Sequence, residues 1–249
     1  MDEAEALKIT LAELHEAVAL MARAVPRPKM VKTASGAHYR YVEQLVQQAL
    51  VLKCVRAMSA LTALQTLIGA GLALDAGASM RILDEIGSDV MFLAAPLVLP
   101  VEPEERHKRY LSEFFQEEFD SENPLKATQK RHRVSRSDIR AYVARTYRVD
   151  MPVSDVVRVT ETIENAFSGY IHGAAAHTID VYDGNRFCVP LKVGDGPLEA
   201  VREQIITYAF RALVSAELVS KALRQYAMAR HLRNVRIEIY DDYGAVRRG

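Results

Sequence analysis

Apolar positions recur three or four residues apart along most of the chain, the spacing typical of amphipathic α-helices. The helices that this pattern predicts cover residues 3–24, 38–74, 76–97, 104–120, 136–147, 155–172 and 197–233. Strand-like alternation is confined to short segments. The pattern therefore predicts an all-α protein, built as a single helical bundle of about six to eight helices.

Segments rich in Gly, Pro and polar residues separate the predicted helices. Residues 29–37 are expected to form a loop, and residues 121–134 a longer surface loop. Residues 181–193 are expected to form a loop with at most a short hairpin, and the alternating tail 234–249 is expected to be flexible or extended. With no internal repeat and no low-complexity tract, residues 1–249 are expected to form one helical domain.

One apolar stretch raises the question of a membrane. Residues 57–74 carry no charged side chain over 18 positions, close to the lower limit for crossing a bilayer. Polar residues nevertheless recur on one side of this helix: Gln44, Gln48, Arg56, Ser59, Thr62 and Thr66. A helix with an apolar face and a polar face is half buried in protein. The sequence thus predicts no membrane partner, and the acidic start MDEAEALKIT is not expected to be a secretory signal.

Composition and charge narrow the class further. The chain is 49% hydrophobic and 26% charged, with 32 Lys and Arg against 32 Asp and Glu. A neutral total argues against a protein whose whole surface binds nucleic acid, but it allows a local basic patch. The two cysteines, Cys54 and Cys188, are interpreted as reduced thiols, which is typical of a cytoplasmic protein.

Two pairs of polar residues are candidates for chemistry. Arg81 and Glu85 are four apart within an apolar stretch, so they share one helix face. They form either a surface ion pair, a buried structural pair or part of a site. Ser168 and His172 are likewise one turn apart, and histidine acts as acid or base near neutral pH. A hydrogen-bonded core histidine is an equally good interpretation of His172.

A basic stretch follows an acidic one. Between residues 126 and 148 there are eight Lys or Arg against the single acid Asp138. The candidates for contacts with nucleic-acid phosphates are Lys130, Arg131, Arg133, Arg136 and Arg140. The alternative is that these cations pair with the acids of residues 102–122, within the fold or across a dimer.

Metal and cofactor signals are weak. A carboxylate-bridged bundle needs Glu-x-x-His on two helices, and only Glu104 and His107 have this spacing. The zincin motif, CxxC and the phosphate-binding glycine motifs are all missing from the sequence. No metal and no cofactor are expected.

The segments ASMRILDEIGSDVMFL and NAFSGYIHG resemble the DUF5677 family of bacterial helical proteins, which pair an Arg-x-x-x-Glu helix with a later Ser-x-x-x-His helix. The matching positions are Arg81, Glu85, Ser168 and His172. The resemblance implies a bundle similar to the HEPN domains of bacterial toxins and antiphage systems, many of which are dimeric ribonucleases with an Arg-x(4–6)-His motif. That spacing occurs here only as Arg224 to His231, and no Arg precedes His172 in this way.

Three functional hypotheses follow. The first is a helical interaction or regulatory protein, a homodimer connected with stress or phage defence, in which the four matching residues form an interior polar network. The second is a HEPN-like, metal-independent ribonuclease with His172 as acid or base and Arg81 as the stabiliser of charge. The third is a bundle that binds a small molecule between the 76–97 and 155–172 helices. RNA and protein both remain open as partners.

Overall fold

The computed structural model describes residues 1–117, 119–126, 128, 130–147 and 152–247. Within these residues it contains nine α-helices, one 3-10 turn (Pro124–Lys126) and a two-stranded sheet. The helices are α1 (Glu3–Arg23), α2 (Val46–Gly69), α3 (Ala73–Val98), α4 (Glu105–Phe114), α5 (Arg136–Thr146), α6 (Val153–His172), α7 (Ala175–Ile179), α8 (Gly196–Ala222) and α9 (Tyr226–Ile239). The predicted all-α class is confirmed.

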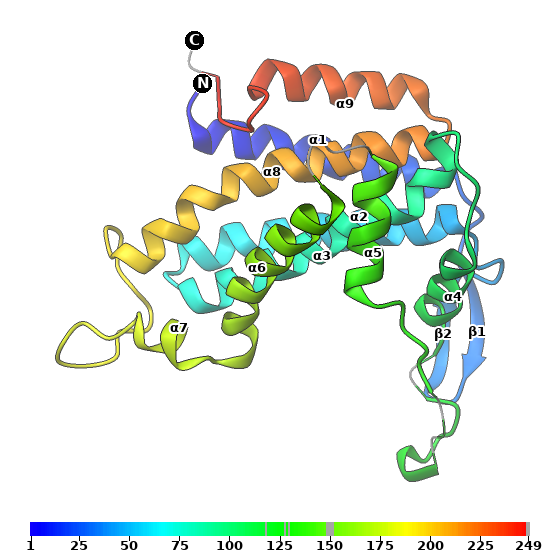
Figure 1. Ribbon diagram of the computed structural model, residues 1–249, viewed down its shortest axis with the longest axis horizontal. Helices are drawn as coiled ribbons and strands as arrows, with labels where there is room; N and C mark the ends of the chain where they lie inside the picture. The colour runs from blue at the N-terminus through cyan, green and yellow to red at the C-terminus, as the bar shows by residue number, and fades with distance from the viewer. Residues whose placement is uncertain (118, 127, 129, 148–151, 248–249) are drawn as a thin grey trace.

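The core lies between the three longest helices. The α2, α3 and α8 helices pack against one another, and α1 and α9 cover α8 from outside (Figure 1). Leu61, Met80 and Leu213, one from each core helix, are completely buried. This arrangement buries a continuous apolar interior, which is the main source of stability in a bundle.

The long apolar helix is part of this core. Among the described residues, α2 is the one helix long and apolar enough to cross a membrane. It packs against α1, α3 and α8, while its polar residues Ser59, Thr62 and Thr66 are exposed. The α2 helix therefore contributes to the core of the bundle and exposes most of its predicted polar face, although Gln48 of that face is buried.

Two projections leave the core on opposite sides of the view in Figure 1. One consists of α6, α7 and residues 180–195, and we call it the apolar arm. The other consists of a β-hairpin, α4 and residues 121–134, and we call it the basic arm. The described residues of 121–133 are mostly exposed, in agreement with the expected surface loop.

The hairpin is not where the sequence predicted it. Strands β1 (Lys29–Thr33) and β2 (Gly36–Arg40) pair antiparallel, with Lys29 opposite Arg40. The prediction of a loop at 29–37 and a helix from residue 38 is therefore wrong. Gly36, at φ 122°, makes the tight turn between the strands. Near 181–193 the structure has one isolated antiparallel bridge, between Tyr182 and Phe187.

The C-terminal helical run is broken once and is longer than predicted. Arg224, at φ 59°, interrupts it, and α9 then continues to Ile239. Residues 234–239 are thus helical, and the prediction of an extended segment is wrong there. The reason is burial, because Leu232, Ile239 and Tyr240 all lie in the core, and the hydroxyls of Tyr240 and Thr10 share a 2.7 Å hydrogen bond. Residues 248–249 of the expected tail lie outside the described residues.

Candidate functional site

Charged side chains line α3 inside the bundle, where apolar residues would be expected. Arg81, Asp84 and Asp89 contact charged residues of neighbouring helices, and both aspartates are buried. Glu85 pairs with Arg81 along the same helix. Buried charges are tolerated only where partners compensate for their desolvation. The partners of these charged residues therefore decide whether the residues stabilise the fold or form a functional site.

The first group of charges joins α3, α5 and α6. Arg81 contacts Glu85 at 2.7 Å and Glu164 at 3.3 Å, and Arg140 contacts Glu164 at 3.5 Å. The Glu164 side chain is only 3% exposed. Within the described part of the chain, Oε1 of Glu164 and one Nη1 each of Arg81 and Arg140 lack a hydrogen-bond partner. This group fixes the positions of three helices, although its pairing is incomplete.

A second group surrounds Asp89. Its carboxylate accepts hydrogen bonds from Lys53 of α2 at 2.7 Å, Tyr110 of α4 at 2.6 Å and Arg136 of α5 at 2.5 Å. Burial acts to raise the pKa of Asp89, but the charges of Lys53 and Arg136 outweigh it and hold the pKa below its ordinary value. The Asp89 carboxylate is therefore ionised and fully paired at neutral pH.

A third group connects α3 to α8. Asp84 accepts hydrogen bonds from the Tyr208 hydroxyl at 3.0 Å and from Arg211 at 2.6 Å. Burial and the nearby Asp84 charge raise the pKa of Tyr208 well above its usual value, so this phenol stays protonated. Beside Arg211, a small cavity of about 200 Å³ lies between α3 and α8.

The sequence analysis identified only part of this network. It named Arg81, Glu85, Arg136 and Arg140, and it missed Asp84, Asp89 and Glu164. A signal for the aspartates was present in ILDEIGSDVMF, where acids interrupt an apolar run. No comparable signal marked Glu164, because its neighbours Ile163 and Asn165 do not reveal which face of the helix turns inward.

The structure does not bring the four matching residues together. Arg81 and Glu85 form the predicted ion pair, whereas His172 is exposed at the last residue of α6, two turns beyond Glu164. Among the described residues, no hydrogen bond or ion pair joins Ser168 or His172 to Arg81 or Glu85. Between α3 and α6 lie the Arg81–Glu164 contact and the Tyr170 ring, which packs on Gly77.

The basic candidates divide into two sets. Arg136 and Arg140 turn inward to Asp89 and Glu164, so they compensate buried acids. Lys130, Arg131 and Arg133 lie in the exposed loop, where Arg131 and Arg133 contact Glu113 of α4 at 3.7 and 3.5 Å. The expected pairing with the acidic stretch thus occurs, but it leaves part of the positive charge on the surface.

The α6 helix is only partly covered by its neighbours, and some of its apolar residues are exposed. The one buried residue among its 20 positions is Glu164, a charged residue. Val159 and Ile163 are each 48% exposed, and Ile171 is exposed to a similar extent. A surface helix normally turns its apolar face toward the core. Here the half-buried positions are mostly apolar, among them Val156, Val157 and Phe167, whereas Val159 and Ile163 lie among exposed polar residues such as Arg158 and Glu161. The α6 helix thus leaves part of its apolar surface open.

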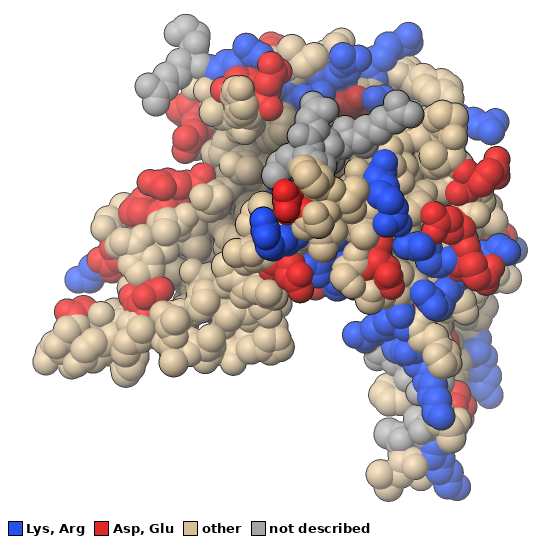
Figure 2. All heavy atoms as spheres, in the orientation of Figure 1, with Lys and Arg blue, Asp and Glu red and all other residues tan. Residues whose placement is uncertain are grey.

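The rest of the apolar arm also exposes apolar side chains. Ile179, Tyr182, Phe187, Val189 and Val193 are all exposed. In the lower left of Figure 2 the end of this arm is mostly tan, whereas Lys and Arg gather on the arm at the lower right. The apolar arm also exposes charged residues, namely Arg158, Glu161, Asp180, Asp183, Arg186 and Lys192. Scattered exposed apolar residues are normal, but a contiguous group usually marks an interaction site.

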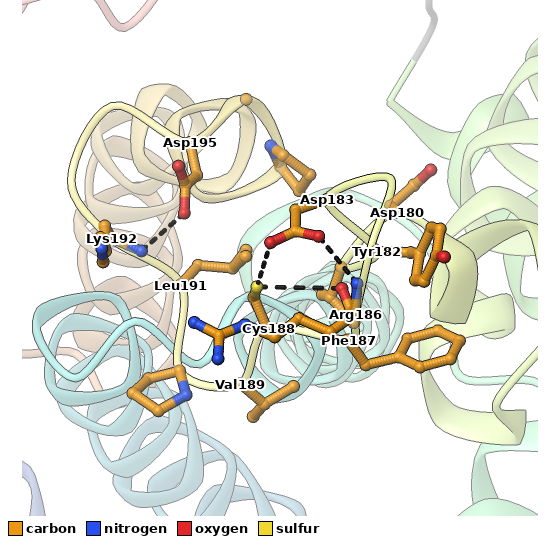
Figure 3. Close-up of a pocket in the computed structure, with 14 residues that line it drawn as sticks. Asp180, Tyr182, Asp183, Arg186, Phe187, Cys188, Val189, Leu191, Lys192 and Asp195 are labelled. Atoms are coloured by element: carbon orange, nitrogen blue, oxygen red, sulfur yellow. Dashed lines mark hydrogen bonds between the residues drawn. The ribbon is translucent and has the colours of Figure 1, made fainter.

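The 180–195 loop is held in shape by its own side chains. Asp183 accepts hydrogen bonds from the backbone N–H groups of Asn185 and Arg186, and from the Cys188 thiol at 3.1 Å (Figure 3). The bond to Asp183 raises the pKa of the Cys188 thiol and keeps it protonated. A cavity of about 560 Å³ lies within the loop. The rings of Tyr182 and Phe187 pack together, with their centroids 5.1 Å apart.

Each acid of the α3 network contacts at least one cation, and in the described part of the chain no three His, Cys, Asp or Glu residues gather as a possible metal site. No family model, curated protein or solved structure matches the chain. The resemblance to DUF5677 proteins therefore stays a prediction.

Proposed function

We propose that the chain is a helical interaction protein that acts as a homodimer and uses the apolar arm as its contact surface. The observation that carries this proposal is the set of exposed apolar side chains on α6 and on the loop after it, including Val159, Ile163 and Phe187. The buried Glu164 of the same helix is compensated within the chain by Arg81 and Arg140. A partner would cover the exposed apolar side chains.

A second copy suits this surface for two reasons. Homodimer interfaces are more apolar than ordinary protein surface, and a two-fold contact buries the same patch on both chains. The exposed charges of the arm are also balanced, so two copies can meet without strong repulsion of like charges; the cations are Arg158, Arg186 and Lys192, and the acids are Glu161, Asp180 and Asp183. A regulatory role in stress or phage defence, which the resemblance predicts, forms part of this proposal.

The exposed apolar side chains of the arm are supported from beneath. The α6 helix is attached to α3 by the Arg81–Glu164 contact and by the close packing of Tyr170 on Gly77. Because these attachments fix the helix in position, the apolar surface is ordered before a partner arrives. Such pre-organisation lowers the entropic cost of association.

Sedimentation velocity of the purified chain and its Ile163→Glu variant tests the proposal. We expect the wild-type chain to be dimeric, and the Ile163→Glu dimer to dissociate at least about tenfold more readily, because a charge would be buried in an apolar contact.

The matched control is Ile237→Glu, since Ile237 is 47% exposed but lies on α9, outside the arm. This variant should dimerise like the wild type. A monomeric wild-type chain at about 100 μM would overturn the proposal, as would equal weakening by the two substitutions.

A further inference from the structure

A groove crosses the basic arm, far from the apolar arm in Figure 1. Its volume is about 660 Å³, and it lies between α4 and the segment that leads into α5. Glu105, Arg109 and Ser112 form one wall, and their spacing of four and three places them on one face of α4, while Gln116 extends this wall just after the helix. Lys130 and His132 form the opposite wall.

The two walls are joined by ion pairs. Arg131 and Arg133 both contact Glu113 of α4, so the segment that carries Lys130 and His132 is attached across the helix. On its other side α4 packs into the core through Tyr110 and through His107, which stacks on Phe92 with ring centroids 4.2 Å apart. The groove is therefore built on a fixed helix and does not depend on a free loop alone.

The charge in and around the groove is positive. Glu105 contacts Lys108, and Glu113 contacts two arginines, so each acid is already compensated. Arg109 and Lys130 contact no carboxylate in the described part of the chain. The groove and its joining residues together hold five cations and two acids, namely Lys108, Arg109, Lys130, Arg131 and Arg133 with Glu105 and Glu113. Figure 2 shows this concentration of Lys and Arg at the lower right.

Neutral hydrogen-bond donors accompany the cations. Ser112, Gln116 and Gln44 line the groove and offer one hydroxyl and two amides. Gln44 is held at φ 52°, a left-handed conformation that is uncommon for a residue with a long side chain. Cations combined with hydroxyl and amide donors are the groups that proteins use to contact phosphate and sugar oxygens.

We propose that this groove binds the phosphate backbone of single-stranded nucleic acid. A linear chain of phosphates fits a concave, two-walled groove with donors on both walls, whereas an anionic membrane surface would meet a flat or convex basic face. Arg136 and Arg140 take no part, because they are paired with buried acids. The inference is independent of dimerisation through the apolar arm, which shares none of these residues.

Fluorescence anisotropy with a fluorescein-labelled oligouridylate of about 20 nucleotides tests this inference on the full chain. We expect binding at about 50 mM salt that weakens about 20-fold at about 200 mM, the dependence that follows if about three phosphates are contacted. The Lys108→Glu/Lys130→Glu variant should bind at least about tenfold more weakly than wild type. Both residues are exposed, so folding should be unaffected, and Lys108→Gln/Lys130→Gln should show a smaller loss in the same direction.

The matched control is Arg230→Glu/Arg233→Glu, which makes the same change of net charge at two exposed positions on α9. This control should bind within about twofold of wild type. Equal loss in the control would show that overall charge, and not the groove, attracts the strand. The absence of binding at low salt would also overturn the inference, as would binding to phosphatidylserine vesicles without binding to the oligonucleotide. Unchanged sedimentation of the groove variant would keep this result separate from the proposed dimer.

Discussion

At the scale of single residues, the position of Glu164 is the most consequential. It is a carboxylate buried between Arg81 and Arg140, and it brings together α3, α5 and α6. Desolvating three charges is costly, and a few of their polar atoms lack partners in the described part of the chain. The cluster therefore adds little net stability, but the loss of one member leaves buried charge uncompensated. We interpret it as a device that specifies how α6 is placed.

Removing Glu164 tests this interpretation. Glu164→Ala should lower the free energy of unfolding by about 3 kcal/mol or more, because Arg81 and Arg140 would stay buried without their shared acid. Glu85→Ala should cost less than about 1 kcal/mol, since the Glu85 side chain is 44% exposed. His172→Ala, at an exposed position, should change little. Urea denaturation measures all three, and a Glu164→Ala cost no larger than that of Glu85→Ala would contradict the interpretation.

The pH dependence of stability should carry the signature of His107. Burial lowers the pKa of this ring, whose neutral form accepts a hydrogen bond from the Glu104 N–H and donates one to the Phe92 carbonyl. Because the unfolded state then binds a proton more readily, the free energy of unfolding should fall as pH drops below about 6.5, by up to about 1.4 kcal/mol per pH unit. A further decline below about pH 4 should follow from Asp89, whose pKa is also lowered.

Two substitutions separate this effect from that of the other histidines. The His107→Phe variant keeps an aromatic ring against Phe92, but this ring cannot titrate. The free energy of unfolding of this variant should therefore no longer fall with pH just below pH 6.5. His15→Gln, at an exposed position of α1, should keep it. Urea denaturation across the pH range gives the comparison, and an unchanged slope in His107→Phe would assign the effect to another group.

At the scale of elements, α6 packs against α3 and α5. Beside the Glu164 contacts, a close attachment is made by the Tyr170 ring, which packs directly on the backbone of α3 at Gly77. Glycine is needed there for closeness and not for its backbone angles, because a Cβ on residue 77 would lie 2.5 Å from Cγ of Tyr170. Val159, Ile163 and Ile171 of α6 stay exposed, and this is why we assign them to a partner.

Substitution of two glycines in the same helix tests this attachment. Gly77→Ala should destabilise the protein by about 1 to 3 kcal/mol and weaken dimerisation, because the methyl group would displace Tyr170 and with it the arm. Gly87→Ala should be neutral or stabilising by up to about 1 kcal/mol, since its Cβ would meet only Arg211, at 3.9 Å. In the Gly77→Ala/Tyr170→Ala double variant, the cost of the added methyl group should disappear. Thermal denaturation and sedimentation provide both measurements.

At the scale of the whole molecule, the chain separates two kinds of surface around one core. The apolar arm and the basic arm leave the bundle at opposite sides of the view in Figure 1, and the charges seen in Figure 2 follow that division. The formal net charge of zero conceals this polarity, because the compensating acids lie elsewhere on the surface or pair with buried arginines. A dimer formed through the apolar arms would present two basic grooves away from its interface, which suits an adaptor between copies of the chain and a nucleic-acid strand.

Much of the local structure was readable from the sequence because it depends on local physics. The ends of α1 and α5 were predicted to within a residue or two, and Ser135 caps α5 by accepting a hydrogen bond from the Asp138 N–H. The pairing of Arg81 with Glu85 followed from helix geometry alone. The hairpin at 29–40 was missed because its pairing is between strands, and α9 was cut short because the burial of Ile239 depends on the rest of the fold.

The sequence by itself determined the helical class, the core character of α2 and the presence of charge within α3, since these depend on spacing and composition. Only the tertiary structure decided which charges meet. It brought Glu164 to Arg81, which lies 83 positions earlier in the sequence, and it turned Arg136 and Arg140 inward. It also placed His172 apart from Arg81 and Glu85. Periodicity shows that a helix has an apolar face, but not whether that face meets the core or the solvent. For α6 that choice depends on helices that are distant in sequence, and it is the choice on which the proposed function depends.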